Sequence, residues 1–152
     1  KYLPSAWDNR HLLTLSGTYK LPKNWDVGLK LRVMGGAPFT PYDENLSSIV
    51  SAWDATARPY YDYDLYNTGR LKTFSQIDFR LDKSFYFKGV MLGIYIDLQN
   101  IGNFKYDSQP VLVSTGVVDP QIYPDGNQHY KMKYIRQQSG TILPTLGLTV
   151  EF

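Results

Sequence analysis

The sequence lacks several features that would point to common soluble or helical membrane proteins. It contains no cysteine, which excludes disulfide bonds, thiolate metal sites and a cysteine nucleophile. It has no apolar run of about 18 residues, so no segment is typical of a transmembrane helix. Histidine is scarce: His11 and His129 are the only two, and their wide separation in the sequence does not indicate a metal site. We expect neither histidine to have a functional role.

Charge of one sign is also missing, because 16 Lys and Arg stand against 14 Asp and Glu and leave a net charge of +2. This balance gives no broad electrostatic case for nucleic acid or for an anionic membrane surface as partner. The sequence begins with Lys1 and shows neither an initiator methionine nor a signal peptide. We therefore expect it to be part of a longer or processed polypeptide.

A catalytic set is absent from the sequence pattern. No Gly-x-Ser-x-Gly motif occurs, and no nucleophile, base and orienting acid can be recognised together. Asp78, Arg80 and Asp97 could suggest acid–base chemistry, but a network of structural charges explains them better. The sequence predicts that the protein is not an enzyme.

The sequence is rich in aromatic residues, at 15%, and in alternation of apolar and polar residues. The alternation is clearest over 25–33, where Trp25, Val27 and Leu29 lie on one face and Asp26, Lys30 and Arg32 on the other. Similar patterns occupy 13–20, 76–82, 90–99 and 145–152, and no window has a convincing helical period. The pattern predicts an all-β protein with an antiparallel meander of about five strands.

The connections between these strands alternate in length. They are short at 21–24 and 85–89 and long at about 36–72 and 102–128, and 111–136 is partly extended, so we expect the last two strands to project beyond a bilayer. In a meander, every second connection lies at the same end of the sheet. Tight turns at one end and long loops at the other are typical of bacterial outer-membrane β-barrels, whose long loops are extracellular.

The two faces of such strands can be assigned by energetic cost. A Lys or Arg facing lipid near the bilayer centre costs about 2–4 kcal/mol, so the apolar face is expected to meet lipid. Tyr19, Trp25, Phe85, Phe87 and Phe152 lie near the short turns, as the aromatic girdle of a barrel would. The charges predicted to face the barrel interior are Lys30, Arg32, Asp78, Arg80, Asp82 and Asp97.

Short motifs in this order along the chain resemble the C-terminal portion of TonB-dependent outer-membrane receptors, especially the Bacteroidetes type. They are the Trp-Asp-Asn-Arg-His-Leu of 7–12, the segment 25–41 with its Gly-Gly-Ala-Pro-Phe-Thr-Pro, the Asn-Thr-Gly-Arg-Leu of 67–71, and the segments 76–83 and 95–100. The ending is a second resemblance, because Thr145, Gly147, Val150 and Phe152 match the C-terminal signal that barrels present to their assembly machinery.

The resemblance implies a large transmembrane barrel with a plug in its lumen. Residues 1–152 would be its C-terminal segment, the last five or so strands, with the plug and the other strands outside this chain. The whole protein would import a scarce nutrient across the bacterial outer membrane. Its expected partners are the rest of the barrel and the plug, outer-membrane lipid, the barrel assembly machinery and a surface lipoprotein lid, but no nucleic acid.

Candidate ligand contacts lie in the first long loop, whose aromatic side chains could stack on a sugar, a peptide or an aromatic ligand. The alternative is that they pack against their neighbours or a lid. These residues are Trp53, Tyr60, Tyr61, Tyr63 and Tyr66. Asp62, Asp64 and Asn67 have a spacing that could offer oxygen ligands to Ca²⁺, but the glycine and glutamate of an EF-hand are absent, so we expect no cofactor.

Two other interpretations remain open. A soluble β-sandwich that binds carbohydrate would show the same alternation, since its strands also have one apolar and one polar face. It would have to bury Val27, Leu29, Ile94 and Ile96 against protein. An omptin-like outer-membrane hydrolase is a third interpretation, disfavoured because a whole barrel and its acidic catalytic groups would have to fit in this length.

Overall fold

The computed structural model describes residues 3–152. The chain is mostly β, with 53% of its residues in strands and 10% in helices. It divides into two compact units. The sheet unit comprises Asn9–Gly35, Thr73–Tyr106 and Ser139–Phe152, and the loop unit comprises the residues up to Asp8 with Gly36–Lys72 and Asp107–Gln138.

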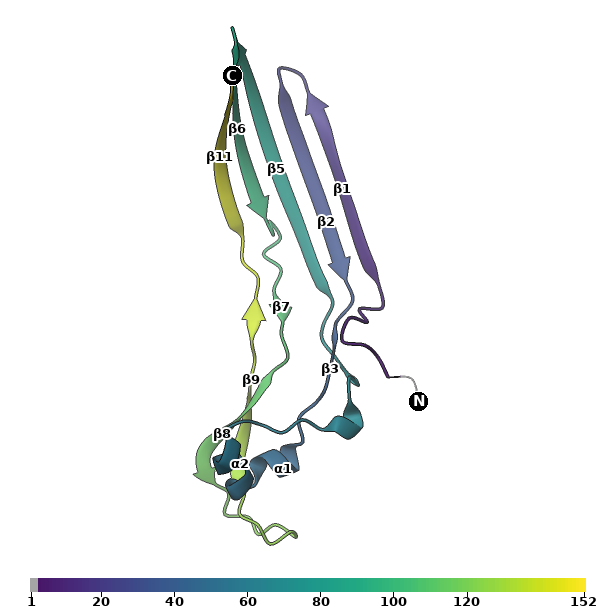
Figure 1. Ribbon diagram of the computed structural model, residues 1–152, viewed down its shortest axis with the longest axis vertical. Coiled ribbons are helices and arrows are strands. Elements are labelled where there is room, and N and C mark those ends of the chain that lie inside the picture. Colours follow the sequence, from purple (N-terminus) through teal and green to yellow (C-terminus); the bar gives the residue numbers. More distant parts are fainter. Residues whose placement is uncertain (1–2) are drawn as a thin grey trace. The chain divides into compact units, whose positions relative to one another are not determined.

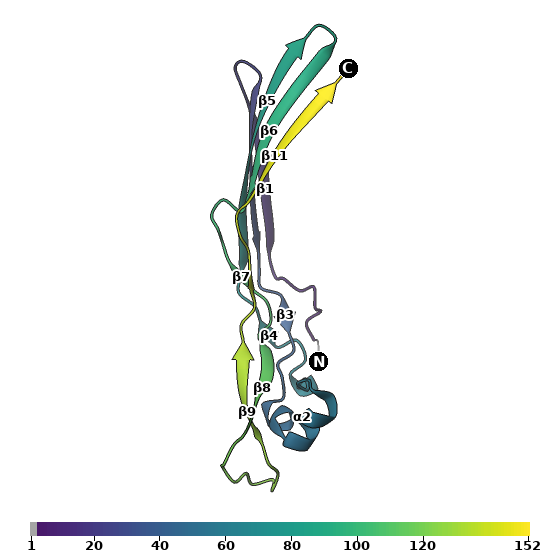
Figure 2. The same ribbon diagram turned by 90° about the vertical axis from the view of Figure 1, so that its left-hand side faces the viewer.

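The sheet unit is built on one antiparallel sheet of five strands in the order β1-β2-β5-β6-β11 (Figure 1). Turned by 90°, these strands form a single layer (Figure 2). The sequence prediction of five antiparallel strands is confirmed. The strands are β1 (Leu12–Leu21), β2 (Trp25–Met34), β5 (Phe74–Phe87), β6 (Val90–Gln99) and β11 (Leu143–Glu151).

Two tight turns join neighbouring strands at one end of the sheet. Between β1 and β2, Lys23 and Asn24 adopt positive φ values of 65° and 61°. Between β5 and β6, Lys88 and Gly89 suffice, because Gly89 has a φ of 79° that glycine adopts without steric cost. The predicted connection 85–89 was too long. Phe85 and Phe87 belong to β5, where they pair with apolar residues of β6 and extend the ladder.

Both long connections leave the sheet at its opposite end. There β6 ends at Gln99, and the next residue, Asn100, is buried and has a φ of 55°. The Asn100 amide donates to the carbonyl oxygens of Phe104 at 3.0 Å and Thr141 at 3.3 Å, and its oxygen accepts from the Phe104 N–H at 3.0 Å. Asn100 therefore holds the backbone of Phe104 and Thr141 in place at the point where β6 stops pairing with its neighbours.

The first long connection contains helices that the sequence did not predict. They are α1 (Glu44–Ser48), α2 (Val50–Thr56) and a 3₁₀ turn, η1 (Tyr63–Leu65), beside a short pair of strands, β3 (Pro38–Phe39) and β4 (Gly69–Arg70). The prediction of no helix was wrong because one or two turns are too short to show a helical period. Asp43 caps α1 by accepting a hydrogen bond from the Leu46 N–H at 2.9 Å.

The second long connection forms a hairpin of β8 (Val111–Val118) and β9 (Tyr130–Ile135). The extended structure predicted within 111–136 is confirmed, but these are separate strands, since β6 ends at Gln99 and Asn100 breaks the ladder. Two further strands, β7 (Tyr106–Asp107) and β10 (Gln138–Ser139), pair with each other where the chain passes between the units. Leu112 of β8 is the buried hydrophobic residue of the described chain.

Candidate functional site

The polar face of the sheet carries the charges that the sequence assigned to the barrel interior. Strand register places all six charged residues on one face of the sheet. Five of them line a hollow of about 480 Å³ on that face, and Asp82 lines a neighbouring hollow. The five are Lys30, Arg32, Asp78, Arg80 and Asp97. The sequence thus predicted correctly which charges share a face.

Asp78 is the centre of the polar face. Its carboxylate accepts from Arg32 Nη2 at 3.3 Å, from Gln76 Nε2 at 2.6 Å and from the backbone N–H of Asn100 at 3.0 Å. Because these donors come from two strands and from the end of a third, the carboxylate ties the strand ends together. Within residues 3–152, the Arg32 Nε atom is buried and has no hydrogen-bond partner.

A second polar group surrounds Arg80. Its guanidinium grips Asp82 with a fork of hydrogen bonds, 2.9 Å from Nε to Oδ2 and 2.7 Å from Nη2 to Oδ1. The same guanidinium lies 4.2 Å from the centre of the Tyr95 ring. That ring covers Gly147, since a Cβ at Gly147 would lie 2.1 Å from it. Gly147 was predicted as part of an assembly signal, and here its missing side chain makes room for the tyrosine.

The other face of the sheet, which we call the apolar face, is open. Leu29 and Leu148 are more than half exposed, and Leu146 is 74% exposed. The predicted girdle residues Tyr19, Trp25, Phe85 and Phe87 lie on this face near the two tight turns, and Phe152 follows the end of β11. The remaining members are Leu13, Leu15, Leu21, Val27, Leu31, Val33, Ile77, Phe79, Leu81, Lys83, Val90, Leu92, Ile94, Ile96, Leu98 and Val150, with the small residues Gly17, Ser75 and Pro144.

Three of the motifs that carry the family resemblance meet in the loop unit. Arg70 forms an ion pair with Asp8 at 2.5 Å and donates a further hydrogen bond to the Asp8 carbonyl oxygen. It also donates to the Gly36 carbonyl oxygen at 3.3 Å. Asn67 is buried, and its amide donates to the Pro4 carbonyl oxygen at 2.7 Å. These hydrogen bonds and the ion pair link three segments, 4–8, 36–40 and 67–70. The motif residues Asp8, Asn67 and Arg70 therefore stabilise the loop unit.

The predicted aromatic ligand site is only partly assembled. Tyr61 stacks on Tyr42 with ring centres 4.9 Å apart, and Tyr63 lies next to it with centres 6.3 Å apart. Burial, helped by the Tyr61 hydroxyl, raises the pKa of Tyr42 to about 12. Tyr60 instead donates to the Ala52 carbonyl oxygen at 3.2 Å and holds the helices in place. Tyr42, which follows the Pro-Phe-Thr-Pro segment, was not among the predicted ligand contacts.

Among residues 3–152, Trp53 and Tyr66, the other two candidates, make no contact with another aromatic ring. Trp53 lies within α2 and is partly exposed, whereas Tyr66 follows η1 and is exposed. The exposed rings of Tyr61, Tyr63 and Tyr66 are the part of the predicted set that a ligand could reach.

Two of the three side chains considered for Ca²⁺, those of Asp62 and Asn67, are engaged in local structure. Asp62 caps η1 by accepting from the N–H groups of Asp64 at 3.0 Å and Leu65 at 3.3 Å. The Asn67 side chain is used by Pro4 and Thr40. No group of three or more His, Cys, Asp or Glu side chains with metal-site geometry occurs among residues 3–152.

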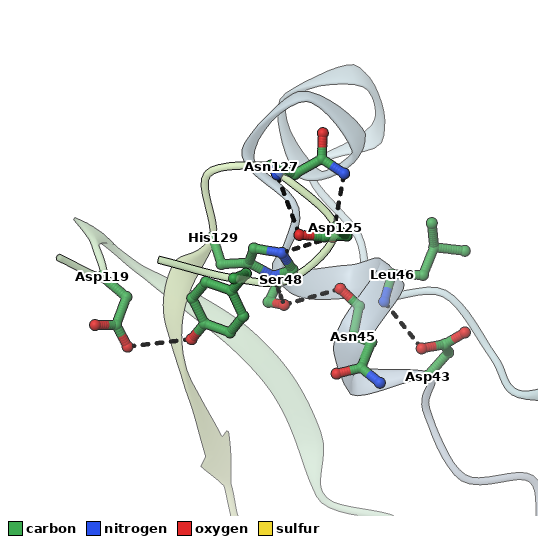
Figure 3. Close-up of polar contacts among 9 residues, drawn as sticks. Asp43, Asn45, Leu46, Ser48, Asp119, Asp125, Asn127 and His129 are labelled. Atoms are coloured by element: carbon green, nitrogen blue, oxygen red, sulfur yellow. Dashed lines mark hydrogen bonds and ion pairs between the residues drawn. The ribbon is translucent and has the colours of Figure 1, made fainter. Parts of the chain in front are cut away.

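The structure brings together a polar cluster that the sequence did not predict: Ser48, His129 and Asp125 (Figure 3). His129 Nδ1 lies 2.6 Å from Ser48 Oγ, and its Nε2 lies 3.0 Å from Asp125 Oδ2. The imidazole is 3% exposed and stacks on Tyr123 with centres 3.9 Å apart. Hydrogen bonds from Asn127, and then the His129 ring, lower the pKa of Asp125.

No spacing rule could find this cluster, because Ser48 and His129 are 81 positions apart. The connectivity is that of a nucleophile, a base and an orienting acid. However, the ring is almost fully covered, and Ser48 Oγ also donates to the Asn45 carbonyl oxygen at 2.8 Å. We interpret the cluster as a fastening that holds α1 against the loop between β8 and β9. A structural role of this kind does not test the expectation that His129 has no functional role, which stays a prediction.

No family model matches this chain, and comparisons with curated proteins and with solved structures found no significant match. The resemblance to TonB-dependent receptors therefore stays a prediction from motifs. In the part of the chain that the structure describes, no helix is long and apolar enough to cross a membrane.

Proposed function

We propose that this chain forms part of the wall of an outer-membrane β-barrel that belongs to a TonB-dependent nutrient import receptor. The observation that carries the proposal is the sheet with two different faces. Register across all five strands keeps one face open and, except for Lys83, apolar, and gathers the other strand charges on the opposite face. A sheet of this kind is stable where hydrocarbon covers one face and a polar lumen or plug the other.

The edges of the sheet favour the same environment. Within residues 3–152, β1 pairs only with β2, and β11 pairs only with β6. In hydrocarbon each unpaired backbone group would cost several kcal/mol, by the order of magnitude known for buried amides. Barrel closure removes these edges. We therefore propose that further strands of the same barrel flank β1 and β11.

The connections support an outer-membrane barrel, and the motifs support the receptor rather than a barrel of another kind. Tight turns lie at one end of the sheet and both long connections leave at the other, as periplasmic turns and extracellular loops do. Two of the segments that resemble the family, 7–12 and 67–71, are joined by the ion pair between Asp8 and Arg70. In this proposal the polar face contacts the plug, and the exposed Tyr61, Tyr63 and Tyr66 contact a ligand at the outer mouth.

A soluble β-sandwich that binds carbohydrate is the second candidate. It would need a second layer over Val27, Leu29, Ile94 and Ile96. The sheet unit has a single layer, and its apolar face presents Leu146 at 74% exposure. A soluble sheet with that face in water would be a site of aggregation, so the membrane proposal fits better.

Labelling of single cysteines tests the placement, because the natural chain has none. In intact cells, a membrane-impermeant maleimide is expected to label Ile122→Cys, which is 93% exposed in the loop unit. Lys88→Cys at a tight turn should react only after the outer membrane is opened. Leu148→Cys should resist the aqueous reagent although it is exposed in the isolated sheet. Equal labelling of all three would contradict the proposal.

An uptake assay tests the receptor part. Cells with and without the protein are given labelled oligosaccharides, peptides and aromatic compounds, before and after the inner membrane is de-energised. Uptake that needs both the protein and the energised membrane is expected. Uptake that is independent of energy would indicate a passive channel instead.

A further inference from the structure

One charged residue, Lys83, interrupts the apolar face. In the register of the five described strands it lies between Trp25 of β2 and Ile94 of β6, at the level of the β1–β2 turn. Every other member of this face is apolar, aromatic or small. A lysine at such a place requires a partner or a polar boundary, since a charge facing lipid at the bilayer centre costs about 2–4 kcal/mol.

The surroundings of Lys83 hold its ammonium group in place. The Nζ atom lies 5.1 Å from the centre of the Trp25 ring and 5.2 Å from that of Phe85. It donates one hydrogen bond to the Lys23 carbonyl oxygen, at the turn. An ammonium has three N–H donors, so two are left for another acceptor.

The neighbouring carboxylate does not neutralise Lys83. Asp82 lies on the polar face, where Arg80 grips it. Among residues 3–152, no carboxylate lies within ion-pair distance of Lys83 Nζ. Lys23 and Lys88 are exposed in the two tight turns and add positive charge at the same end of the sheet. The missing partner should therefore be an anion that approaches from the apolar side.

We propose that Lys83, framed by Trp25 and Phe85, binds the phosphate of an anionic phospholipid headgroup at the membrane boundary near the tight turns. The inference rests on the proposed function, because it needs lipid on the apolar face. The rings lie at the depth that aromatic girdles occupy, and the ammonium supplies the charge that a phosphate requires. The occupant is a lipid because its acyl chains would continue over Leu81, Ile94 and Leu148 of the same face.

Quenching of Trp25 fluorescence by brominated lipids tests the site. The intact protein is placed in bilayers with increasing fractions of brominated phosphatidylglycerol or brominated phosphatidylcholine, and the Trp25 signal is isolated as the difference from Trp25→Phe. We expect about a fivefold preference for the anionic lipid, as for one lysine near an anionic surface. Lys83→Gln should abolish the preference, and Lys83→Arg should retain it.

Lys20→Gln is the matched control, because it removes the same charge near the same turn but from the polar face, opposite Asp26. It should keep the preference. Equal quenching by both lipids in the natural protein, or an equal effect of Lys83→Gln and Lys20→Gln, would overturn the lipid site and leave the proposed function standing. Failure of both lipids to quench Trp25 would overturn the two proposals together.

Discussion

The two units of this protein differ in which side chains they expose and which they bury. The sheet unit turns its large apolar residues outward and is held by the backbone ladder, with charges paired on one face. The loop unit buries several polar residues instead: Ser47, Asn67 and His129 are buried and hydrogen bonded, whereas in the described part of the sheet unit the buried polar residue is Asn100, just beyond β6. Among residues 3–152, the hydrophobic residue that is buried, Leu112, also belongs to the loop unit.

This difference indicates two different surroundings. Buried hydrogen bonds between side chains can fix long loops that must be stable in water without a large core. An outward apolar face is favourable only where water is excluded. A charge placed on the apolar face should therefore destabilise the sheet unit. Loss of a buried hydrogen bond in the loop unit should destabilise that unit alone.

The largest effect is expected for Leu29→Arg in the middle of the apolar face. If lipid covers this face, the folded state should lose about 2–4 kcal/mol. Unfolding by urea in lipid vesicles, followed by gel mobility with and without heating, measures the loss. Thr18→Arg is the control, because Thr18 lies opposite Gly28 on the polar face and should be tolerated. Equal stability of the two arginine variants would mean that both faces of the sheet contact water.

A smaller effect is expected for Gly147→Ala. The new Cβ would lie 2.1 Å from the Tyr95 ring, so the ring and the Arg80 stacked on it must move. The cost should be about 1–3 kcal/mol in the same unfolding assay. Gly17→Ala, with no atom within 4 Å of its Cβ, should instead be neutral or stabilise by about 0.5–1 kcal/mol.

A Tyr95→Ala background checks the cause. The cost of Gly147→Ala should disappear there, because no ring is left to displace. If the cost persists without the ring, the glycine is required by the strand itself and the packing explanation is wrong.

In the loop unit, Ser48→Ala should have a local effect. It leaves Nδ1 of the buried His129 ring without its partner, which costs about 1–3 kcal/mol by the usual range for an unsatisfied buried group. Hydrogen exchange of the amides of 119–129 should become faster, while exchange in β2 and β5 stays unchanged. Ser51→Ala in α2 is the control, since Ser51 is exposed. Faster exchange in the sheet as well would show that the units are not independent.

The smallest effect concerns Tyr134, whose hydroxyl donates to Glu44 at 2.6 Å. Burial, followed by the hydrogen bond and charge of Glu44, raises the pKa of Tyr134 to about 12. Because folding raises the pKa of Tyr134, its neutral hydroxyl contributes fully to the free energy of unfolding below the unfolded-state pKa of about 10. This contribution is lost as the pH rises through the folded-state pKa of about 12. Glu44→Gln should lower this pKa partway, because burial remains.

Nuclear magnetic resonance of ¹³C-labelled tyrosine rings follows the titration, and Tyr134→Phe identifies the signal. An unchanged pKa in Glu44→Gln would show that burial alone is responsible.

Much of the sheet followed from the sequence. Strands such as 25–33 and 90–99 were found because a period of two needs only local residues, and the common face of Lys30, Asp78 and Arg80 followed from that period. The short helices α1 and α2 were missed, since one or two turns carry no period. The turn at Lys88 and Gly89 was placed too early because Phe85 and Phe87 continue a ladder that only their partners on β6 reveal.

The sequence by itself determined the strands, their two faces and the uneven connections, because alternation and turn chemistry are local. Tertiary structure decided the contacts between residues distant in sequence. It brought Ser48 to His129, Asp8 to Arg70 and the Tyr95 ring over Gly147, and it left Lys83 framed by aromatic rings on an otherwise apolar face. Such contacts depend on strand register and on loop paths, which no local pattern encodes.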